Sequence, residues 1–240
     1  NIKKLPIDLV SINCVNPEES VKAFDYCNNF FEFNNIILFT DQDINTNYRL
    51  VKINPLNSIK EYNNFLLTIN PYIDSDFALI VQDDGHIVNP TKWNAEFLNY
   101  DYIGAPWPNN QAWKKRFKRK YNKEVADVIT KNINKNQVGN GGFSLRSKKF
   151  LEYSQTFNNC NNIAEDIFLC IYNFEKSQDY GVRFPNLNIA KEFSYEMSLR
   201  KIVKYRETKN KNFNMDHHFG WHGKRFKNYE FLLNLKNDKD

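Results

Sequence analysis

The sequence predicts an α/β fold with a central, mostly parallel mixed sheet flanked by helices. Apolar runs typical of buried strands alternate with amphipathic helical stretches through residues 1–85. The first strand, the helix after it and the second strand span about thirty residues, the length of a parallel crossover unit. Residues 77–81 are apolar without alternation, as in a strand buried on both faces. We therefore expect a single domain over residues 1–240.

The first crossover is expected between residues 7 and 40. Residues 7–15 are apolar enough for a first strand, and Asn16 and Pro17 follow directly with two acidic residues. Asn is a favoured N-cap, Pro suits the first helical position, and acids stabilise a helix N-terminus, so a helix begins here. A second strand at 36–40 and a third at 48–53 complete this part of the predicted sheet.

A second helix and a fourth strand follow. Ser58 and Glu61 have the spacing of a capping box, and an apolar face runs from Ile59 to Ile69 before Pro71 ends the helix. The fourth strand is 77–81, which is followed at once by acidic residues. In sheets of this kind ligands bind beyond the carboxyl ends of the strands, so we expect a site at this edge.

The remainder of the chain shows weaker periodicity. Two prolines within three residues, Pro106 and Pro108, are expected to stop any strand there. Residues 109–137 are polar and basic, which predicts a mobile excursion with one short helix near Val125 to Ile129. Because Asn is abundant throughout the chain, Asn runs are not used as a structural signal. The other expected elements are helices at 147–157 and 163–174, then short strands and turns at 182–206.

Composition and charge exclude several classes of protein. The formal net charge of +5 is concentrated in Lys114–Lys120, whereas a nucleic-acid-binding footprint would be more widespread, so nucleic acid is not expected as a partner. Taken alone, that basic run could contact lipid headgroups at a membrane surface, nucleic acid or an acidic glycan, or it could be a solvated loop. The four cysteines lack CxxC spacing, and no signal peptide or membrane-spanning apolar run is visible, which favours the cytoplasm.

An acidic cluster follows the fourth strand. Asp83 and Asp84 end the apolar run, and His86 comes two residues later. Ionised carboxylates are costly to bury alone, and Mn²⁺ and Mg²⁺ prefer carboxylate oxygens, Mn²⁺ also accepting imidazole. The cluster therefore predicts a divalent ion that bridges a diphosphate. The alternative is a polar strand end that caps a turn.

A glycine-rich stretch at 139–142 holds three of the chain's eight glycines. Glycine tolerates positive φ and lets the backbone approach a ligand closely, so Gly141 and Gly142 could contact a sugar or phosphate. The stretch lacks the spacing of a P-loop or of a dinucleotide-binding fingerprint. A glycine-rich bulge between strands explains it equally well.

Glu165 and Asp166 open the helical pattern at 163–174. Neighbouring residues on a helix point about 100° apart, so only one of them can face a given site. A carboxylate in a partly dry cleft can serve as a general base. Alternatively, both acids merely complement the helix dipole.

Three of the four histidines lie between residues 217 and 222. Histidines at this spacing on a helix could bind zinc. However, Gly220 and Gly223 argue against a helix, and no cysteine pair accompanies the histidines. One of them could join the ion held by Asp84. They could also be surface histidines in an aromatic tail.

Taken in order, these motifs resemble those of a little-characterised family of bacterial and viral GT-A-like glycosyltransferases. The resemblance covers most of residues 77–223, and each motif is weak alone whereas the ordered set is much more specific. The motifs are Gln82-Asp83-Asp84-Gly85, Tyr102-Ile103-Gly104-Ala105-Pro106-Trp107, Gly139-Asn140-Gly141-Gly142-Phe143-Ser144-Leu145-Arg146, Glu165-Asp166, and Phe219-Gly220-Trp221-His222-Gly223.

The resemblance implies a GT-A-like single domain that transfers a sugar from a nucleotide-sugar donor, preferably a UDP-sugar, to a hydroxyl acceptor such as a glycan, with inversion. Residues 1–85 would form the nucleotide-binding half, and residues 86–240 the acceptor-binding and catalytic half. A non-catalytic nucleotide- or carbohydrate-binding module of the same fold is the alternative.

The resemblance also implies roles for single residues. Asp84 and His222 would hold Mn²⁺ or Mg²⁺. His86 departs from a usually hydrophobic position, but it creates an Asp-x-His motif similar to that of polypeptide N-acetylgalactosaminyltransferases and is a further candidate ligand. Asp166, or Glu165 in its place, would be the base, as in β-1,4-galactosyltransferases. The residues expected to bind the donor are Asn13, Cys14, Val15, Asp41, Gln82, Asp83, Gly141 and Gly142.

Overall fold

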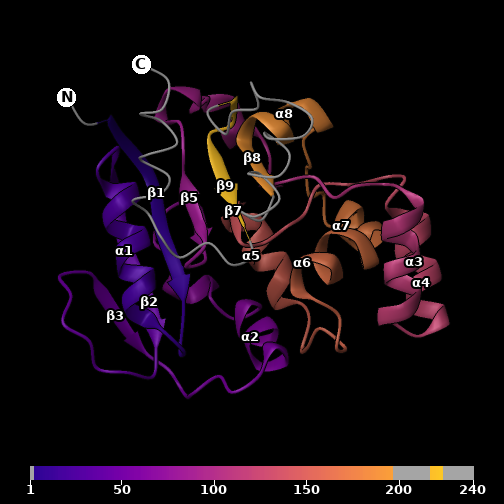
Figure 1. Cartoon of the computed structure of the whole chain (residues 1–240), viewed down its shortest axis with the longest axis horizontal. Helices are drawn as coiled ribbons and strands as arrows, with labels where there is room; N and C mark the ends of the chain where they lie inside the picture. Colours follow the sequence, from indigo (N-terminus) through magenta and orange to yellow (C-terminus); the bar gives the residue numbers. More distant parts are fainter. Residues whose placement is uncertain (1–2, 197–216, 224–240) are drawn as a thin grey trace, which may run out of the picture.

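A six-stranded sheet forms the centre of the computed structural model, which describes residues 3–196 and 217–223 (Figure 1). Its strand order is β3-β2-β1-β4-β7-β6. Strands β1 to β4 pair in parallel, whereas β7 is antiparallel to both β4 and β6. The strands are β1 (Lys3–Ile12), β2 (Phe31–Thr40), β3 (Arg49–Lys52), β4 (Phe77–Val81), β6 (Tyr102–Gly104) and β7 (Phe143–Ser147). The predicted α/β fold with a mostly parallel mixed sheet is confirmed.

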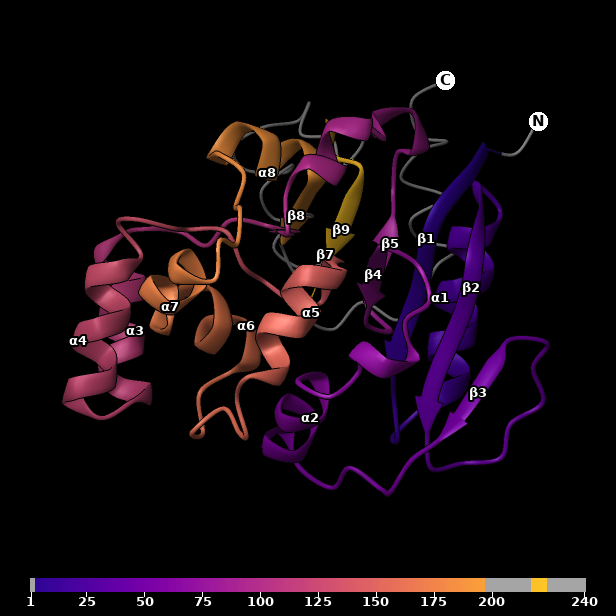
Figure 2. The same cartoon turned by 180° about the vertical axis from the view of Figure 1, so that it is seen from behind.

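Helices cover both faces of this sheet. Helix α1 (Pro17–Asn28) lies in front of β1 and β2 in Figure 1 and behind them in Figure 2. Leu9 of β1 packs into the same core as Phe24 of α1. The next residue, Val10, points to the other face, into the core that contains Leu66 of α2 (Ile59–Leu66) and Leu151 of α5 (Lys148–Gln155). Burial on both faces explains why these strands are continuously apolar.

The first helices begin where the sequence predicts, although one cap differs. Strand β1 ends at Ile12 rather than at residue 15, because the Asn13 side chain accepts hydrogen bonds from the amides of Val15 and Asn16 and turns the chain. The Asn16 side chain makes no capping hydrogen bond to α1. Ser58, in contrast, accepts the predicted bond from the Glu61 amide.

Two helices replace the irregular excursion predicted for residues 109–137. These are α3 (Gln111–Lys120) and α4 (Lys123–Asn132), which lie side by side at the end of the molecule remote from β3 (Figures 1 and 2). Asn110 and Asn122 cap them by accepting hydrogen bonds from the amides of Trp113 and Val125. The short helix expected near Val125 to Ile129 is confirmed by α4. Helix α3 was missed because Asn was not used as a structural signal, although Asn110 is its N-cap.

A second, three-stranded sheet was not predicted. It has the order β5-β9-β8, with β5 (Gly85–Ile87) antiparallel to β9 (Gly220–His222) and β8 (Ser194–Glu196) parallel to it. This sheet joins the acidic cluster after β4 to the histidine-rich segment. Of the region predicted as short strands and turns, residues 187–193 instead form α8 (Leu187–Phe193), and residues 197–206 lie outside the described residues.

The prolines did not stop strand formation completely. Strand β6 forms and ends at Gly104, two residues before Pro106. It is an edge strand that pairs only with β7 in the six-stranded sheet, and edge strands tolerate nearby prolines.

The remaining elements are η1 (Asn70–Tyr72), η2 (Pro90–Lys92), η3 (Ala95–Asn99), α6 (Glu165–Ile167), the π-helical turn η4 (Phe168–Tyr172) and α7 (Phe174–Asp179). Within the described ranges, no helix combines the length and apolar character required to span a membrane.

Candidate active site

The site lies beyond the carboxyl end of β4, where β9 passes over the acidic cluster. Pairing of β5 with β9 sets Gly85 opposite His222. His222 Nε2 lies 3.1 Å from Asp84 Oδ1 and 3.1 Å from Gln82 Oε1. The structure thus brings together the carboxylate and the imidazole that were predicted to share a metal ion.

A second set of contacts orients the His222 ring from its other nitrogen. Nδ1 lies 3.1 Å from Asn140 Oδ1 and 3.6 Å from Glu196 Oε1, and the Asn140 amide in turn donates to Glu196. Asn140 is nearly buried and adopts a φ of 64°, a left-handed conformation that asparagine tolerates better than most non-glycine residues. Burial alone would lower the pKa of His222, but the hydrogen bond and charge of Asp84, with Glu196, raise it above its usual value.

Asp84 and His222 fit two neighbouring positions around a divalent ion. Ligands with bonds of about 2.1 Å at right angles lie about 3.0 Å apart, close to the separation of these two atoms. Within residues 3–196 and 217–223, no three acidic, histidine or cysteine side chains are grouped to hold a metal. Two protein ligands are compatible with Mg²⁺, which commonly takes its other ligands from water and a substrate phosphate.

His86 is placed away from this pair. It lies opposite Trp221 in the β5–β9 register, and since side chains alternate along a strand, it projects to the other face from Gly85. Its ring is fully buried, stacked on Trp221 and edge-on to Tyr26. Burial lowers the pKa of His86 to about 3. The structure therefore contradicts its assignment as a metal ligand and makes it a core residue.

Asp166 and Glu165 have different environments, as the 100° spacing predicted. Asp166 is partly exposed, and its carboxylate accepts hydrogen bonds from the amides of Gly141 (2.9 Å) and Ile167 (2.8 Å). Glu165 is only 2% exposed and forms a bidentate ion pair with Arg146, which is completely buried. Burial raises the pKa of Glu165, and Arg146 opposes that shift. Glu165 is therefore unsuited to the catalytic role, and Asp166 is the candidate base.

The glycine-rich stretch packs closely against the side chains of the site. A Cβ atom on Gly142 would lie 2.1 Å from His222 Nε2, and one on Gly141 would lie 3.0 Å from the Arg146 guanidinium. The close backbone approach is thus required by the protein's own residues. Contact of Gly141 and Gly142 with a donor remains a prediction.

Replacing Gly142 by Ala is expected to displace the His222 ring and weaken Mn²⁺ binding by about tenfold or more, the range seen when groups supporting a metal ligand are altered. Calorimetric titration of Mn²⁺ measures the effect. Gly181→Ala is the control, because its φ of 77° disfavours alanine although it lies beside Lys149 rather than His222. Unchanged Mn²⁺ affinity in Gly142→Ala would contradict the shared site.

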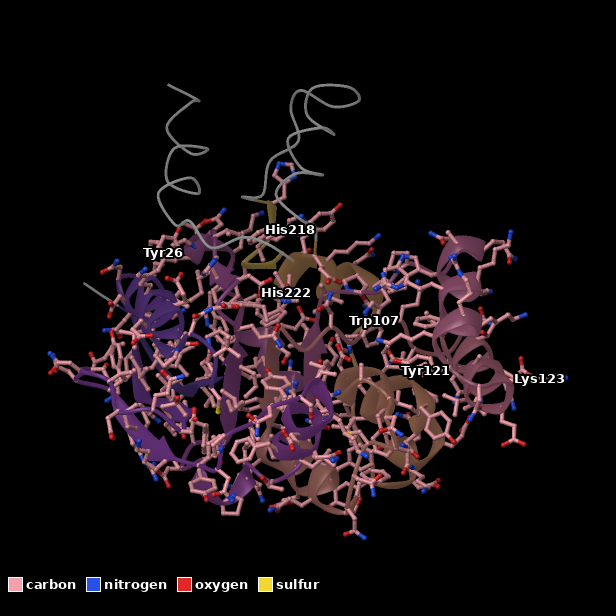
Figure 3. All side chains as sticks on the ribbon, turned by 60° about the horizontal axis from the view of Figure 1, so that its bottom comes forward. Tyr26, Trp107, Tyr121, Lys123, His218 and His222 are labelled. Carbon is pink, nitrogen blue, oxygen red and sulfur yellow. The ribbon has the colours of Figure 1, made fainter. Side chains whose placement is uncertain are left out.

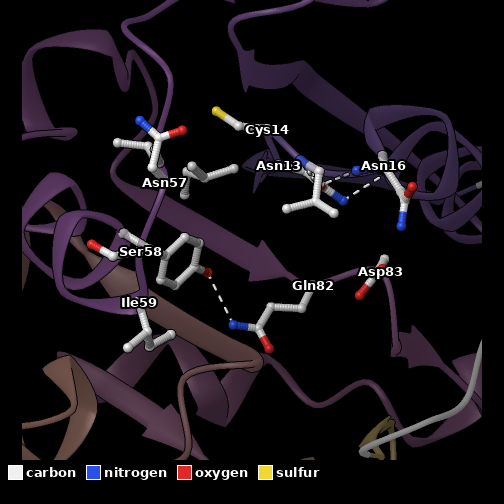
Figure 4. Close-up of a pocket in the computed structure, with 12 residues that line it drawn as sticks. Asn13, Cys14, Asn16, Asn57, Ser58, Ile59, Gln82 and Asp83 are labelled. Carbon is white, nitrogen blue, oxygen red and sulfur yellow. Dashed lines mark hydrogen bonds between the residues drawn. The ribbon is translucent and has the colours of Figure 1, made fainter.

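A pocket of about 370 Å³ adjoins the pair formed by Asp84 and His222 (Figure 4). Its walls come from the turn after β1, the segment that begins α2, and the end of β4. The predicted donor-binding residues in the lining are Asn13, Cys14, Val15, Gln82 and Asp83. Asp41 interacts with Cys14 but is not part of the lining, and neither are Gly141 and Gly142.

One wall of this pocket was missed by sequence reasoning. Residues 56–59 and Tyr62 line it, and the Tyr62 hydroxyl accepts a hydrogen bond of 3.0 Å from Gln82. Ile59 was expected to face the core, yet it is 73% exposed, and Val15 on the facing wall is 77% exposed. The two exposed apolar side chains suit the flat faces of a planar aromatic base, and the neighbouring amide groups suit hydrogen bonds to its edges. The position of Ile59 after the Ser58 cap gives no signal, because Pro17, which follows the Asn16 cap in the same way, is buried.

Comparisons with known proteins give one assignment. A search of curated proteins found no match. Among solved structures, the galactosyltransferase LgtC with donor and acceptor sugar analogues is 13% identical with a TM-score of 0.48 over 96% of this chain and 95% of that chain. An active-site mutant of LgtC gives a TM-score of 0.49 with the same identity and coverage. The bifunctional IspDF from Campylobacter jejuni gives 0.40 at 11% identity over 68% of this chain and 46% of that chain.

Scores below 0.5 leave these structural similarities without weight for activity or substrate. The sequence comparison is firmer. The model of the family described as "protein of unknown function (DUF5672)" matches residues 45–218, which is more than half of the chain. The chain therefore belongs to this family.

Proposed function

We propose that the protein is a metal-dependent glycosyltransferase that moves a sugar from a nucleotide-sugar donor to a hydroxyl acceptor. One observation carries the proposal: a pocket of nucleotide size ends at a carboxylate–imidazole pair that fits a divalent ion. Gln82 connects the two, because it lines the pocket and its side-chain oxygen lies 3.1 Å from His222 Nε2. Asp83 and Asp84 are likewise neighbours, one in the pocket lining and the other in the pair.

Each part of the site has a proposed task. The pocket between Val15 and Ile59 holds the nucleoside, with the base against the exposed apolar side chains and its edges toward Asn13 and Asn57. Asp84 and His222 hold Mn²⁺ or Mg²⁺ at the diphosphate. A divalent cation in that position neutralises the charge that develops on the departing nucleoside diphosphate.

Asp166 is the proposed general base. Its carboxylate is held by the amides of Gly141 and Ile167, which fixes the side chain while leaving lone pairs for an acceptor hydroxyl. It takes the proton as the hydroxyl oxygen attacks the anomeric carbon. A single base on the side opposite the leaving diphosphate inverts the configuration of the sugar, and we include inversion in the proposal.

Removing divalent metal is expected to abolish the activity. Purified protein should hydrolyse or transfer sugar from at least one UDP-sugar in a panel when Mn²⁺ is present, lose this activity in excess chelator, and regain it when Mn²⁺ exceeds the chelator. Liberated UDP measures turnover. Donor binding can be followed independently by thermal unfolding, because a ligand at a hundred times its Kd stabilises the fold by about 2.7 kcal/mol. Full activity in excess chelator would exclude the proposed role of Asp84 and His222.

A further inference from the structure

Helix α3 carries an unusual concentration of positive charge. Six of its ten residues are Lys or Arg and none is acidic: Lys114, Lys115, Arg116, Lys118, Arg119 and Lys120. We call these six residues the α3 basic surface. Because the whole chain has a formal net charge of only +5, all other residues together carry −1. Helix α3 thus carries more formal positive charge than the chain as a whole.

The α3 basic surface is accessible to a partner. All of its residues except the half-buried Lys114 are exposed. Within the part of the chain that the structure describes, none of the six forms an ion pair with a carboxylate. Arg116 instead stacks over Trp113 and Lys120 over Tyr121. The surface therefore retains its full charge for an external anionic group.

The arrangement of the charges indicates the shape of that group. At 100° per residue, the six cations cover an arc of about 240° around α3. Phe117 occupies the remaining stripe and is buried in the core shared with α4. Figure 3 shows Lys123, at the start of α4, at the outer edge of the molecule, well separated from His222. Charge that surrounds a convex helix suits an extended anionic surface better than a single chain in a groove.

We propose that the α3 basic surface docks the protein on an anionic lipid membrane. Each Lys or Arg near such a surface adds to the electrostatic attraction, so several neighbouring cations together can hold a protein there. Trp113 and Tyr121, which contact two of these cations, are packed against the protein core and hold those cations at the surface of α3. Nucleic acid fits less well, because the sequence pI of about 8.8 lies below the values above 9 that are typical of nucleic-acid-binding domains.

Docking through α3 would also orient the active site. The Tyr121 hydroxyl, directly after α3, accepts a hydrogen bond from the amide of Ala164, two residues before Asp166. A membrane against α3 would therefore lie on the side of the site where the base is, rather than on the side of α1. This consequence rests on the proposed function and places the acceptor on a membrane-attached molecule.

Vesicle co-sedimentation tests the docking. The protein should bind vesicles of phosphatidylcholine and phosphatidylserine but not vesicles of phosphatidylcholine alone, and the binding should weaken as salt screens the charges. Replacing Lys115, Lys118 and Arg119 together by Gln should lower the partition coefficient by about a hundredfold, since each cation near the membrane contributes about fivefold. These three side chains are exposed, so thermal unfolding of the variant should match that of the wild type.

A matched variant replaces three exposed lysines outside α3, namely Lys3, Lys92 and Lys176, by Gln. It should bind the vesicles as the wild type does. The proposal would be overturned if both variants lost vesicle binding equally, or if the α3 variant lost none. It would also be overturned if the protein bound RNA but not the vesicles. Vesicle binding requires no turnover, so this result is independent of whether the wild type transfers sugar. Binding of UDP should be the same in all three proteins.

Discussion

Asp166→Asn is expected to lower the rate of sugar transfer by about a hundredfold or more while leaving donor affinity unchanged. The amide has the shape of the carboxylate, and its oxygen can still accept a hydrogen bond from Gly141, although the bond from Ile167 is then lost. The fold should therefore persist. It cannot accept a proton from an acceptor hydroxyl at neutral pH. Turnover measured at saturating donor and acceptor, together with donor affinity from calorimetry, separates the two effects.

Asp127→Asn provides a control for the loss of one negative charge. Asp127 is exposed on α4 and contacts no residue of the proposed site, so this variant should turn over like the wild type. Near-normal transfer by Asp166→Asn would exclude Asp166 as the base. A wild type that binds a UDP-sugar in the presence of Mn²⁺ but never releases product would instead favour a binding module, and binding would then be indifferent to Asp166.

The parts of the site that depend on local structure were predictable. Strand β4 is apolar because both of its faces are covered, and the polar residues directly after it must lie at the sheet edge. Asp84 could therefore be placed at the end of β4 before any long-range contact was known. The environments of Asp166 and Glu165 were partly predictable, since helical spacing allows only one to face the site. Which of the two does so depended on Arg146, nineteen residues earlier in the chain.

The parts that depend on nonlocal pairing were not predictable from local patterns. His86 and His222 looked equally able to join Asp84, and only the β5–β9 register shows that they lie on opposite faces. The resemblance to a family suggested His222, but the three residues of β9 are too few to show a strand periodicity. The segment that begins α2 was likewise recognised as a helix start, whereas its role as a pocket wall depends on the turn after β1.

Arg146→Met is expected to reduce the free energy of unfolding by about 3–5 kcal/mol, because it leaves the Glu165 carboxylate buried without its partner. Arg146 is fully buried and Glu165 is 2% exposed, so water cannot replace the lost contacts. Urea denaturation measures the change. Arg49→Met is the matched control, since Arg49 pairs with Asp74 at the surface, and exposed pairs contribute only about 0–1 kcal/mol.

A second substitution tests whether the uncompensated charge causes the loss. Replacing Glu165 by Leu in the Arg146→Met background removes that charge and should recover most of the stability, since apolar side chains of similar volume commonly substitute for buried ion pairs. Comparable destabilisation in the double variant would show instead that shape or the contacts of Arg146 with Tyr102 and Phe150 dominate.

The pH dependence of the single variant gives an independent check on the same cause. Burial already raises the pKa of Glu165, and loss of Arg146, which opposes that shift, should raise it further. The folded variant then binds a proton more readily than the unfolded chain, so its stability must fall as pH rises between the unfolded and the folded pKa of Glu165. The difference from the wild type should therefore shrink on acidification, where the carboxyl is neutral and less costly to bury. A difference that is constant with pH would show that the charge of Glu165 is not responsible.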